Sequence, residues 1–284
     1  MTIFVYFAEL YLFLLDYISS FFFWGTLVLL VIFWPFFLFG IRKTLLSKRI
    51  FLLSLVASLF LLLYELPIIL TEGNHYLVYS YVPPKEIIKN SGIYTLPVSY
   101  TELKQEEVLD EQAFRDLNSH LMVFDINSAS NFHRYAGKTE AIFKLVRINL
   151  EVDYFHQMSV NVKSYLNTTN SSIDEFLSRS DLEGNSAGLA LVLSGKSEQG
   201  VFKNDIQIGV TGAINKSGKA IEIGLVKEKI ISANKIGLSH VILPFGNLEE
   251  GNDVVKLLNL PLEVIGVKSV DDAIEQINEL NRKK

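Results

Sequence analysis

The chain contains no cysteine. It can therefore build neither a disulfide framework nor a thiolate metal site. An excess of basic charge is also missing, because 26 Lys and Arg residues stand against 31 Asp and Glu residues. Proteins that bind nucleic acid usually carry a basic surface. The five histidines show no spacing typical of a metal site. We therefore expect no nucleic-acid partner, no metal and no cofactor.

Charged residues are absent from a long stretch near the N-terminus. Tyr17 to Ile41 is a run of 25 uncharged residues, and a second apolar run, residues 50–70, is interrupted only by Glu65. A helix of about 20 residues crosses a hydrocarbon core of roughly 30 Å. The two runs (about 17–41 and 50–70) predict a transmembrane helical hairpin within a membrane anchor of residues 1–72. The opening segment is expected to be an interfacial helix, with a third span as the alternative.

Basic residues are also missing before position 42. The connection between the two apolar runs contains Arg42, Lys43, Lys48 and Arg49. Basic loops stay on the cytoplasmic side, so both outer ends of the hairpin should face away from the cytosol. We therefore expect a multi-pass cell-membrane protein, in contact with the lipid bilayer, whose C-terminal region is extracytoplasmic. The lack of a basic N-terminal region also argues against a cleaved signal peptide.

The remaining chain divides into a poorly patterned part and a clearly patterned one. Residues 73–150 are expected to form an extracytoplasmic connector, the N-terminal part of the soluble region. Residues 141–152 and 157–166 have the composition of β-strands. From about residue 181 strand patterns alternate with helix patterns, which predicts an α/β domain over residues 151–284. One of its helices should end at Gly237, and another should begin after Ser269.

The stretch "EGNSAGLALVLSGKS" contains two candidate motifs. Its last residues, Gly195-Lys196-Ser197, resemble the end of a phosphate-binding loop. Such a loop needs a glycine five positions earlier, and that position holds Ala190 inside an apolar run that should be helical. A helix cannot wrap its backbone amides around phosphates. We therefore interpret the triplet as the polar end of a helix.

The first half of the same stretch places Ser186 between Gly184 and Gly188. Glycines allow a sharp turn and a close approach of substrate. Ser186 could simply cap the following helix, or it could be a nucleophile, which would need a base. No histidine stands out as that base. A desolvated lysine can serve, because burial lowers its pKa. Lys227 is a candidate, since it begins a predicted helix where a cation opposes the helix dipole.

Several motifs in order resemble the proteolytic domain of Lon-type serine–lysine peptidases. They are the loop Gly184–Gly188, the pair Thr211-Gly212, the turn glycine Gly218, the segment Ile223–Lys229, the helix through Ala233, and the strand ending at Pro244. The resemblance implies a Lon proteolytic-domain-like fold (ribosomal protein S5 domain 2-like). Together with the anchor, the chain resembles membrane-anchored Lon-like proteases that lack the ATPase module.

The resemblance also implies roles for individual residues. Ser186 would be the nucleophile and Lys227 the general base. Thr211 would help to orient the lysine, and Glu183, Gly184, Asn185 and Gly188 would support the nucleophile loop. The implied activity is ATP-independent hydrolysis of peptide bonds in unfolded or membrane-proximal proteins. A homo-oligomer, possibly a hexameric ring, is implied as well.

Three departures from the family pattern keep alternatives open. Asn185 stands where the family usually has proline, Ala213 where glutamate is frequent, and Leu225 where the second glycine of an IGG segment is expected. One alternative is a catalytically degenerate scaffold that binds peptides or partner proteins. The other is a small-molecule kinase of the GHMP type, whose phosphate loop would need more glycine and serine than "EGNSAG" provides.

Overall fold

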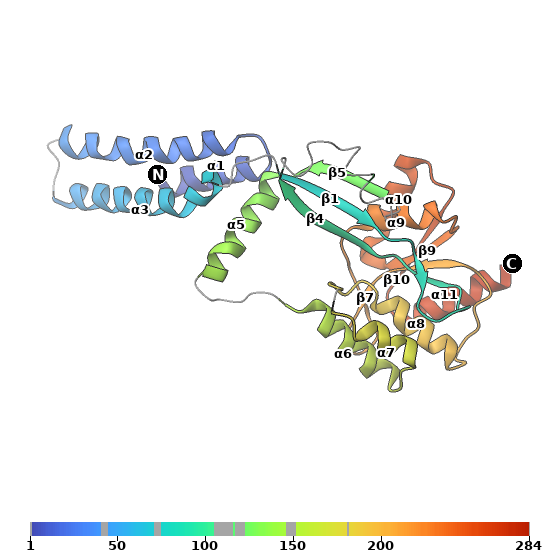
Figure 1. Cartoon of the computed structure of the whole chain (residues 1–284). Coiled ribbons are helices and arrows are strands. Elements are labelled where there is room, and N and C mark those ends of the chain that lie inside the picture. Colours follow the sequence, from blue (N-terminus) through green and yellow to red (C-terminus); the bar gives the residue numbers. More distant parts are fainter. Residues whose placement is uncertain are drawn as a thin grey trace. The chain divides into compact units, whose positions relative to one another are not determined.

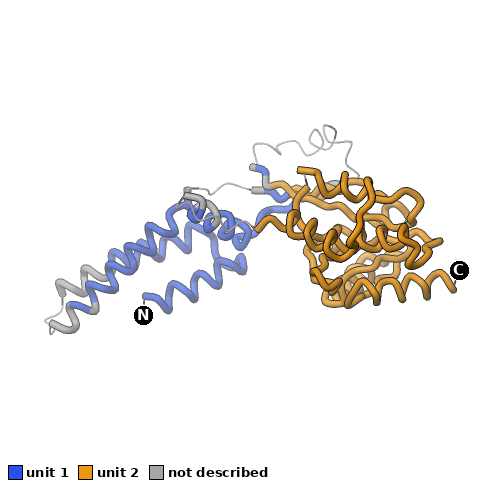
Figure 2. Tube along the Cα trace, turned by 90° about the horizontal axis from the view of Figure 1, so that it is seen from below, with its two compact units in different colours: residues 1–77, 102–109, 127–151 blue, residues 78–101, 110–126, 152–284 orange. Residues whose placement is uncertain are grey.

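The structure is a computed structural model that describes residues 2–40, 45–70, 75–104, 116, 123–145, 152–180 and 182–283. The chain forms two compact units, coloured separately in Figure 2. Unit 1 comprises residues 1–77, 102–109 and 127–151, and unit 2 comprises residues 78–101, 110–126 and 152–284.

Unit 2 is built on a five-stranded sheet with the strand order β10-β9-β6-β3-β2. The first four strands are parallel, and β2 pairs antiparallel with β3. Their bounds are β2 Lys85–Glu86, β3 Ile93–Thr95, β6 Ile208–Val210, β9 His240–Pro244 and β10 Glu263–Val267. Parallel strands covered on both faces read as continuous apolar runs, which explains sequences such as "HVILP".

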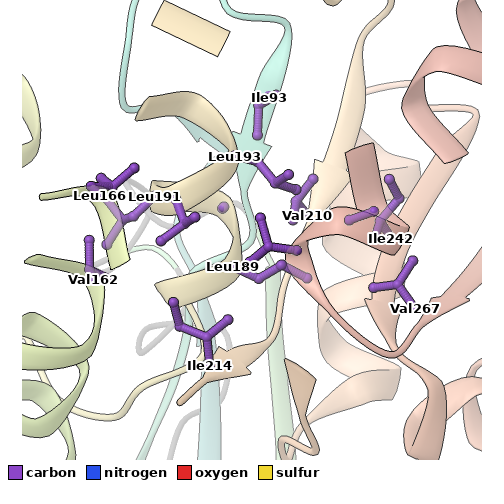
Figure 3. Packing of buried hydrophobic residues seen from close by; sticks show 14 of the residues in the cluster. Ile93, Val162, Leu166, Leu189, Leu191, Leu193, Val210, Ile214, Ile242 and Val267 are labelled. Atoms are coloured by element: carbon purple, nitrogen blue, oxygen red, sulfur yellow. The ribbon is translucent and has the colours of Figure 1, made fainter. Parts of the chain in front are cut away.

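One face of this sheet is covered by α8 (Gly188–Glu198). All residues from Gly188 to Gly195 are buried, because the helix lies between the sheet and the helices α6 (Tyr154–Leu166), α7 (Ser171–Leu177) and α11 (Val270–Lys283). Figure 3 shows Leu189 and Leu193 of α8 among the strand residues Val210 and Ile242. A helix buried on all sides needs apolar residues all round, and "GLALVLSG" supplies them.

The opposite face of the sheet packs against α9 (Val226–Lys235) and α10 (Leu248–Leu258). The side chains of Val226, Ile230 and Ala233 on α9 meet Val241 and Leu243 of β9. Unit 2 is therefore a layered α/β fold, as the sequence predicts. A short hairpin, β7 (Ala213–Ile214) and β8 (Ala220–Ile221), completes it.

The strand prediction for residues 157–166 is wrong, because this segment belongs to the helix α6. Its buried residues Met158, Val162 and Leu166 recur every four positions and pack on α8. The helical period of the apolar residues therefore outweighs their strand-like composition. Residues 141–145 of the other predicted strand lie in the helix α5 (Asn131–Leu145), and residues 146–151 lie outside the described residues.

The predicted helix boundaries of the α/β part are confirmed. After α9, Gly237 has a φ of 78°, and the Leu238 amide donates to the Ala233 carbonyl at 3.1 Å in the manner of a C-cap. Before α11, the Ser269 hydroxyl oxygen accepts a hydrogen bond from the Asp272 amide at 3.1 Å. Local capping interactions therefore determine where α9 ends and where α11 begins.

A second sheet is formed by residues that the sequence left without a clear pattern. It has three strands in the order β4-β1-β5, with the bounds β1 His75–Tyr81, β4 Val98–Lys104 and β5 Val123–Ser128. The core sheet also contains β2 and β3, which precede residue 96. The unit that contains Ser186 therefore begins earlier in the chain than the expected boundary at residue 151, because strand pairing brings these short segments into it.

Unit 1 contains the helices α1 (Thr2–Leu14), α2 (Ser20–Gly40), α3 (Leu45–Leu70) and α5. The helices α2 and α3 run side by side (Figure 1). Among the described residues, one segment, Phe51–Ile69 of α3, is long and apolar enough to cross a membrane, and Ser20–Phe33 is a shorter apolar helix. The helices stand where the apolar runs predict them, whereas membrane crossing stays a prediction. Arg42 and Lys43 lie outside the described residues.

A buried polar cluster joins three helices of unit 1. Lys138 of α5 donates to Glu65 of α3 at 2.5 Å, and both side chains are at most 1% exposed. The hydroxyls of Tyr6 and Tyr135 donate to the other carboxylate oxygen at 2.6 and 3.1 Å. The Lys138 ammonium also lies 4.1 Å from the centre of the Tyr64 ring. Each buried charge is therefore compensated, and the one charge that interrupts the second apolar run has a partner.

We expect the single substitutions Glu65→Leu and Lys138→Met each to destabilise unit 1 by about 3–5 kcal/mol, because each leaves one buried charge unpaired. The double variant should recover most of that loss, since apolar pairs often replace buried ion pairs at little cost. Thermal unfolding of the detergent-solubilised chain measures this. Single variants as stable as the wild type would show that the pair does not hold α5 to α3.

Candidate active site

The loop before α8 turns sharply around Ser186. Gly184 has a φ of 80°, in the left-handed region that glycine adopts easily. The chain then enters α8, whose N-cap is Ala187. Ser186 is partly exposed, whereas every residue from Gly188 to Gly195 is buried. The serine therefore stands at the solvent-accessible start of a rigid, buried helix.

Hydrogen bonds fasten this loop to the end of strand β6. The carbonyl of Ser186 accepts from the Gly212 amide at 2.7 Å and from the Thr211 hydroxyl at 3.3 Å. The Leu189 amide donates in turn to the Gly212 carbonyl at 2.9 Å. Thr211 is 2% exposed and its amide donates to the Ile242 carbonyl of β9 at 3.0 Å. The structure therefore brings Ser186 and Thr211 together.

The start of α9 lies at the same edge of the sheet. The side chain of Asn247, just after β9, donates to the carbonyl of Ile223 and accepts from its amide, both at 3.0 Å. Ile223 immediately precedes the first turn of α9. Because β6 and β9 are parallel neighbours, their carboxyl ends meet at one edge, where open α/β sheets bind ligands. The Ser186 loop and the start of α9 share that edge, and Asn247 is a supporting residue that the sequence analysis missed.

Lys227 does not occupy the dry pocket that the sequence analysis expects. Its side chain is 47% exposed, and its ammonium lies 3.9 Å from the carboxylate of Asp125 on β5. An exposed ion pair of this kind leaves the side chain in contact with water. The helix-start position of Lys227, which favoured it in the sequence, is therefore explained by an acidic partner.

Lys229, two residues further on, is buried. It is 3% exposed, and its amine donates to the Gly224 carbonyl at 3.2 Å. Burial lowers the pKa of Lys229 to about 8, while the negative charge of Glu228 acts in the opposite direction. Such an amine is neutral in a sizeable fraction of molecules near neutral pH, which an exposed lysine is not.

The sequence contained a signal for this burial. The apolar residues Val226, Ile230 and Ala233 define one face of α9, and Lys229 falls on that face at the i+3 position from Val226. Lys227 does not. Helical periodicity therefore distinguishes the two lysines of "KEK", whereas their distance from the helix start does not.

The other predicted residues take more ordinary positions. Glu183 is exposed, and the Asn185 carbonyl accepts from the Gly188 amide at 3.2 Å. In the "GKS" triplet, Gly195 lies in α8, where a Cβ would come within 2.8 Å of the Leu166 side chain. That glycine serves the packing of α8 on α6, and the triplet forms no phosphate loop.

Leu225 adopts a conformation that is costly for its residue type. It precedes α9 with φ 60° and ψ 38°, in the left-handed region. Apart from glycine, the other described residues with positive φ are Asp or Asn, which tolerate this region. For a leucine the strain is about 1–2 kcal/mol. The family's glycine at this position thus has a plain backbone reason, and this chain retains the backbone shape without it.

Comparison with known sequences identifies this region. Residues 180–279 match the sequence model of the family described as the Lon protease (S16) C-terminal proteolytic domain. The C-terminal region is a Lon-type peptidase domain. Similar proteins include the Lon proteases of Clostridium beijerinckii (32% identical over 94 residues), Mycoplasma mycoides (34% over 102) and Mycoplasma pneumoniae (39% over 95).

The similarity to these Lon proteases is confined to one part of each protein. The alignments cover 33–35% of this chain and 12% of each relative. The residues matched by the family model, 180–279, include Ser186, Thr211 and both lysines. What the relatives share with this chain is therefore the Lon-type domain itself.

We expect Leu225→Gly to raise the stability of unit 2 by about 1 kcal/mol, because glycine adopts the left-handed conformation without a Cβ clash. Asn259→Gly is the matched control, since Asn259 also has a positive φ (48°) but tolerates it, and should change stability by a few tenths of that. Chemical unfolding of the detergent-solubilised chain gives both values. A destabilised Leu225→Gly variant would mean that the leucine side chain is needed for packing.

Proposed function

We propose that this chain is a membrane-anchored, ATP-independent serine endopeptidase in which Ser186 is the nucleophile and Lys229 the general base. The observation that carries the proposal is the burial of the Lys229 amine at the sheet edge that also holds the Ser186 loop. A serine hydroxyl needs a base, and a lysine is a base only when neutral. The sequence favoured Lys227, but its exposure and its pairing with Asp125 favour Lys229 instead.

The reaction follows from these two groups. The neutral Lys229 amine takes the proton of the Ser186 hydroxyl while the oxygen attacks the scissile carbonyl carbon. The resulting ammonium gives the proton to the leaving nitrogen, the C–N bond breaks, and an ester on Ser186 remains. A water molecule, deprotonated by the same amine, hydrolyses the ester. A backbone amide of the Ser186 loop would stabilise the oxyanion, a contribution of about 3 kcal/mol per donor in other peptidases.

The other features of the proposal rest on separate observations. The apolar segment Phe51–Ile69 supports the anchor, and the basic connection around Arg42 supports an extracytoplasmic peptidase domain. ATP independence is proposed from the resemblance to membrane-anchored Lon-like proteases. Unfolded or membrane-proximal proteins are the proposed substrates. The homo-oligomeric ring stays a prediction from resemblance.

A second candidate function is a catalytically degenerate scaffold that binds peptides or partner proteins. The strained backbone at Leu225, beside the proposed base, is the observation that favours it. A scaffold would not react with fluorophosphonate probes at Ser186, so labelling of this serine separates the two functions. The GHMP kinase alternative predicts that ATP stabilises the chain against thermal unfolding, and absence of that stabilisation would exclude it.

We expect Ser186→Ala and Lys229→Ala to lower the cleavage of casein or a quenched peptide by about 10²–10⁴-fold, because each removes the nucleophile or its base. Lys227→Ala is the matched control and should keep most activity. Loss of activity in Lys227→Ala, with an active Lys229→Ala variant, would return the role of base to Lys227. Equal activity in all variants would end the serine–lysine mechanism.

The membrane topology can be measured because the chain has no native cysteine. We expect a membrane-impermeant maleimide to label Glu275→Cys, an exposed position of α11, in intact cells. Lys43→Cys, in the basic connection, should react only after lysis. The reverse pattern would place the peptidase domain in the cytosol.

A further inference from the structure

Asn247 is buried at the start of α10 but does not cap that helix. It occupies the N-cap position, where an asparagine side chain usually accepts a hydrogen bond from the first turn, and it makes no such bond. Its side-chain amide, in a residue that is 6% exposed, binds both backbone groups of Ile223 at 3.0 Å instead. The stabilisation that this asparagine provides is therefore directed to the segment before α9.

A second side chain joins the same two segments. Glu222 lies over Gly246, since a Cβ on that glycine would collide with the Glu222 carboxylate. Residues 222 and 223 thus lie beside residues 246 and 247 in one register. The main chain before α9 is held against the turn after β9 at two successive positions.

The residues that follow Ile223 hold Lys229. The carbonyl of Gly224 accepts a hydrogen bond from the Lys229 amine at 3.2 Å. The carbonyl of Leu225 accepts one from the Lys229 backbone amide at 3.1 Å. Both the side chain and the main chain of the buried lysine are therefore bonded to residues directly after the one that Asn247 fixes.

The same short segment is strained. Leu225, with φ 60° and ψ 38°, has a backbone conformation that a leucine rarely adopts. Such a conformation persists only where the surrounding structure enforces it. The two bonds from Asn247 to Ile223, two residues earlier, supply that restraint.

We propose that Asn247 is a positioning residue of the peptidase site, which holds the entrance of α9 in the one conformation that keeps the Lys229 amine away from water. The inference rests on the proposed function, in which Lys229 is the base. Asn247 acts through Ile223 and Gly224 and touches no reacting atom. Its removal should let the strained entrance relax and admit water to the amine.

Burial determines the direction of the expected change. It lowers the pKa of Lys229 to about 8, and the negative charge of Glu228 acts in the opposite direction. Asp125 of β5 pairs with Lys227, and β9 meets α9 with apolar side chains. The charged side chains of α10, which also packs on α9, are exposed: Glu249, Glu250, Asp253 and Lys256. Hydration of the amine should therefore raise its pKa toward the ordinary 10.5.

The test compares Asn247→Ala with Asn204→Ala. Asn204 is the matched control, because its side-chain amide also joins two backbone segments of unit 2, donating to the carbonyls of Ser91 and Ile206 at 2.8 Å. These bonds lie before β3 and β6 begin, at the opposite edge of the parallel sheet. Both substitutions remove an amide that fastens the fold, and only one removes it beside α9.

We expect the acid limb of kcat/KM for a quenched peptide to lie near pH 8 in the wild type and in Asn204→Ala. In Asn247→Ala it should move up by roughly one pH unit, so that activity near pH 7 falls about tenfold and recovers above about pH 10. A merely structural asparagine would lower activity at every pH without moving the limb. Asn247→Gln, which carries the amide one methylene further out, serves if the alanine variant does not fold.

A second readout separates this inference from the proposed function. NMR titration of the Lys229 side chain in the detergent-solubilised chain, assigned by the signal lost in Lys229→Arg, reports its pKa without any turnover. A higher pKa in Asn247→Ala but not in Asn204→Ala supports the inference, even if the wild type cleaves nothing and the peptidase proposal fails. An unchanged pKa in Asn247→Ala, or equal rises in both variants, overturns it.

Discussion

The carbonyl of Ser186 accepts two hydrogen bonds from the end of β6, and the site depends on this fastening. Without it the loop before α8 would be an ordinary surface turn. With it, the serine is fixed to the most deeply buried helix of unit 2 and to the carboxyl edge of the parallel sheet. Asn247 fastens the segment before α9 to the same edge in the same way, by bonding both backbone groups of Ile223. Two segments far apart in sequence therefore meet through main-chain bonds, which do not depend on the identity of most side chains.

At that edge the exposure of two lysines differs, although only one residue separates them in the chain. Lys227 points to water and has a carboxylate of β5 as its partner, whereas Lys229 lies in the apolar face of α9. A lysine in water is almost fully protonated near neutral pH, and a buried lysine is not. Helix geometry therefore places one of these lysines at the surface and the other in the apolar face of α9. Leu225, strained at the entrance of the same helix, shows that the backbone path into α9 is kept even without the family's glycine.

The α/β part of the fold and the sharp turn of the Ser186 loop could be predicted from the sequence, because caps, glycines and alternating patterns are local signals. The sequence analysis favoured Lys227 from its position at the helix start, although the helical periodicity of α9 places Lys229, and not Lys227, on the apolar face. The strand-like composition of α6 led to a wrong prediction, although its apolar residues Met158, Val162 and Leu166 recur with a helical period. The strands β2 and β3 are two and three residues long, which is too short to show an alternating pattern in the sequence. The same holds for Glu65, whose partner Lys138 lies 73 positions away.

The order of the segments in the two units determines where the chain can be truncated. Unit 2 comprises residues 78–101, 110–126 and 152–284, so no single cleavage point separates unit 2 from unit 1. A fragment that began at residue 152 would lack β3, and the backbone of β6 would be bare along the side where β3 normally pairs. Unpaired strands of this kind invite association between copies. Truncated variants should therefore keep the residues before α5. Insolubility of shorter fragments would be caused by the missing strand β3 rather than by an apolar surface.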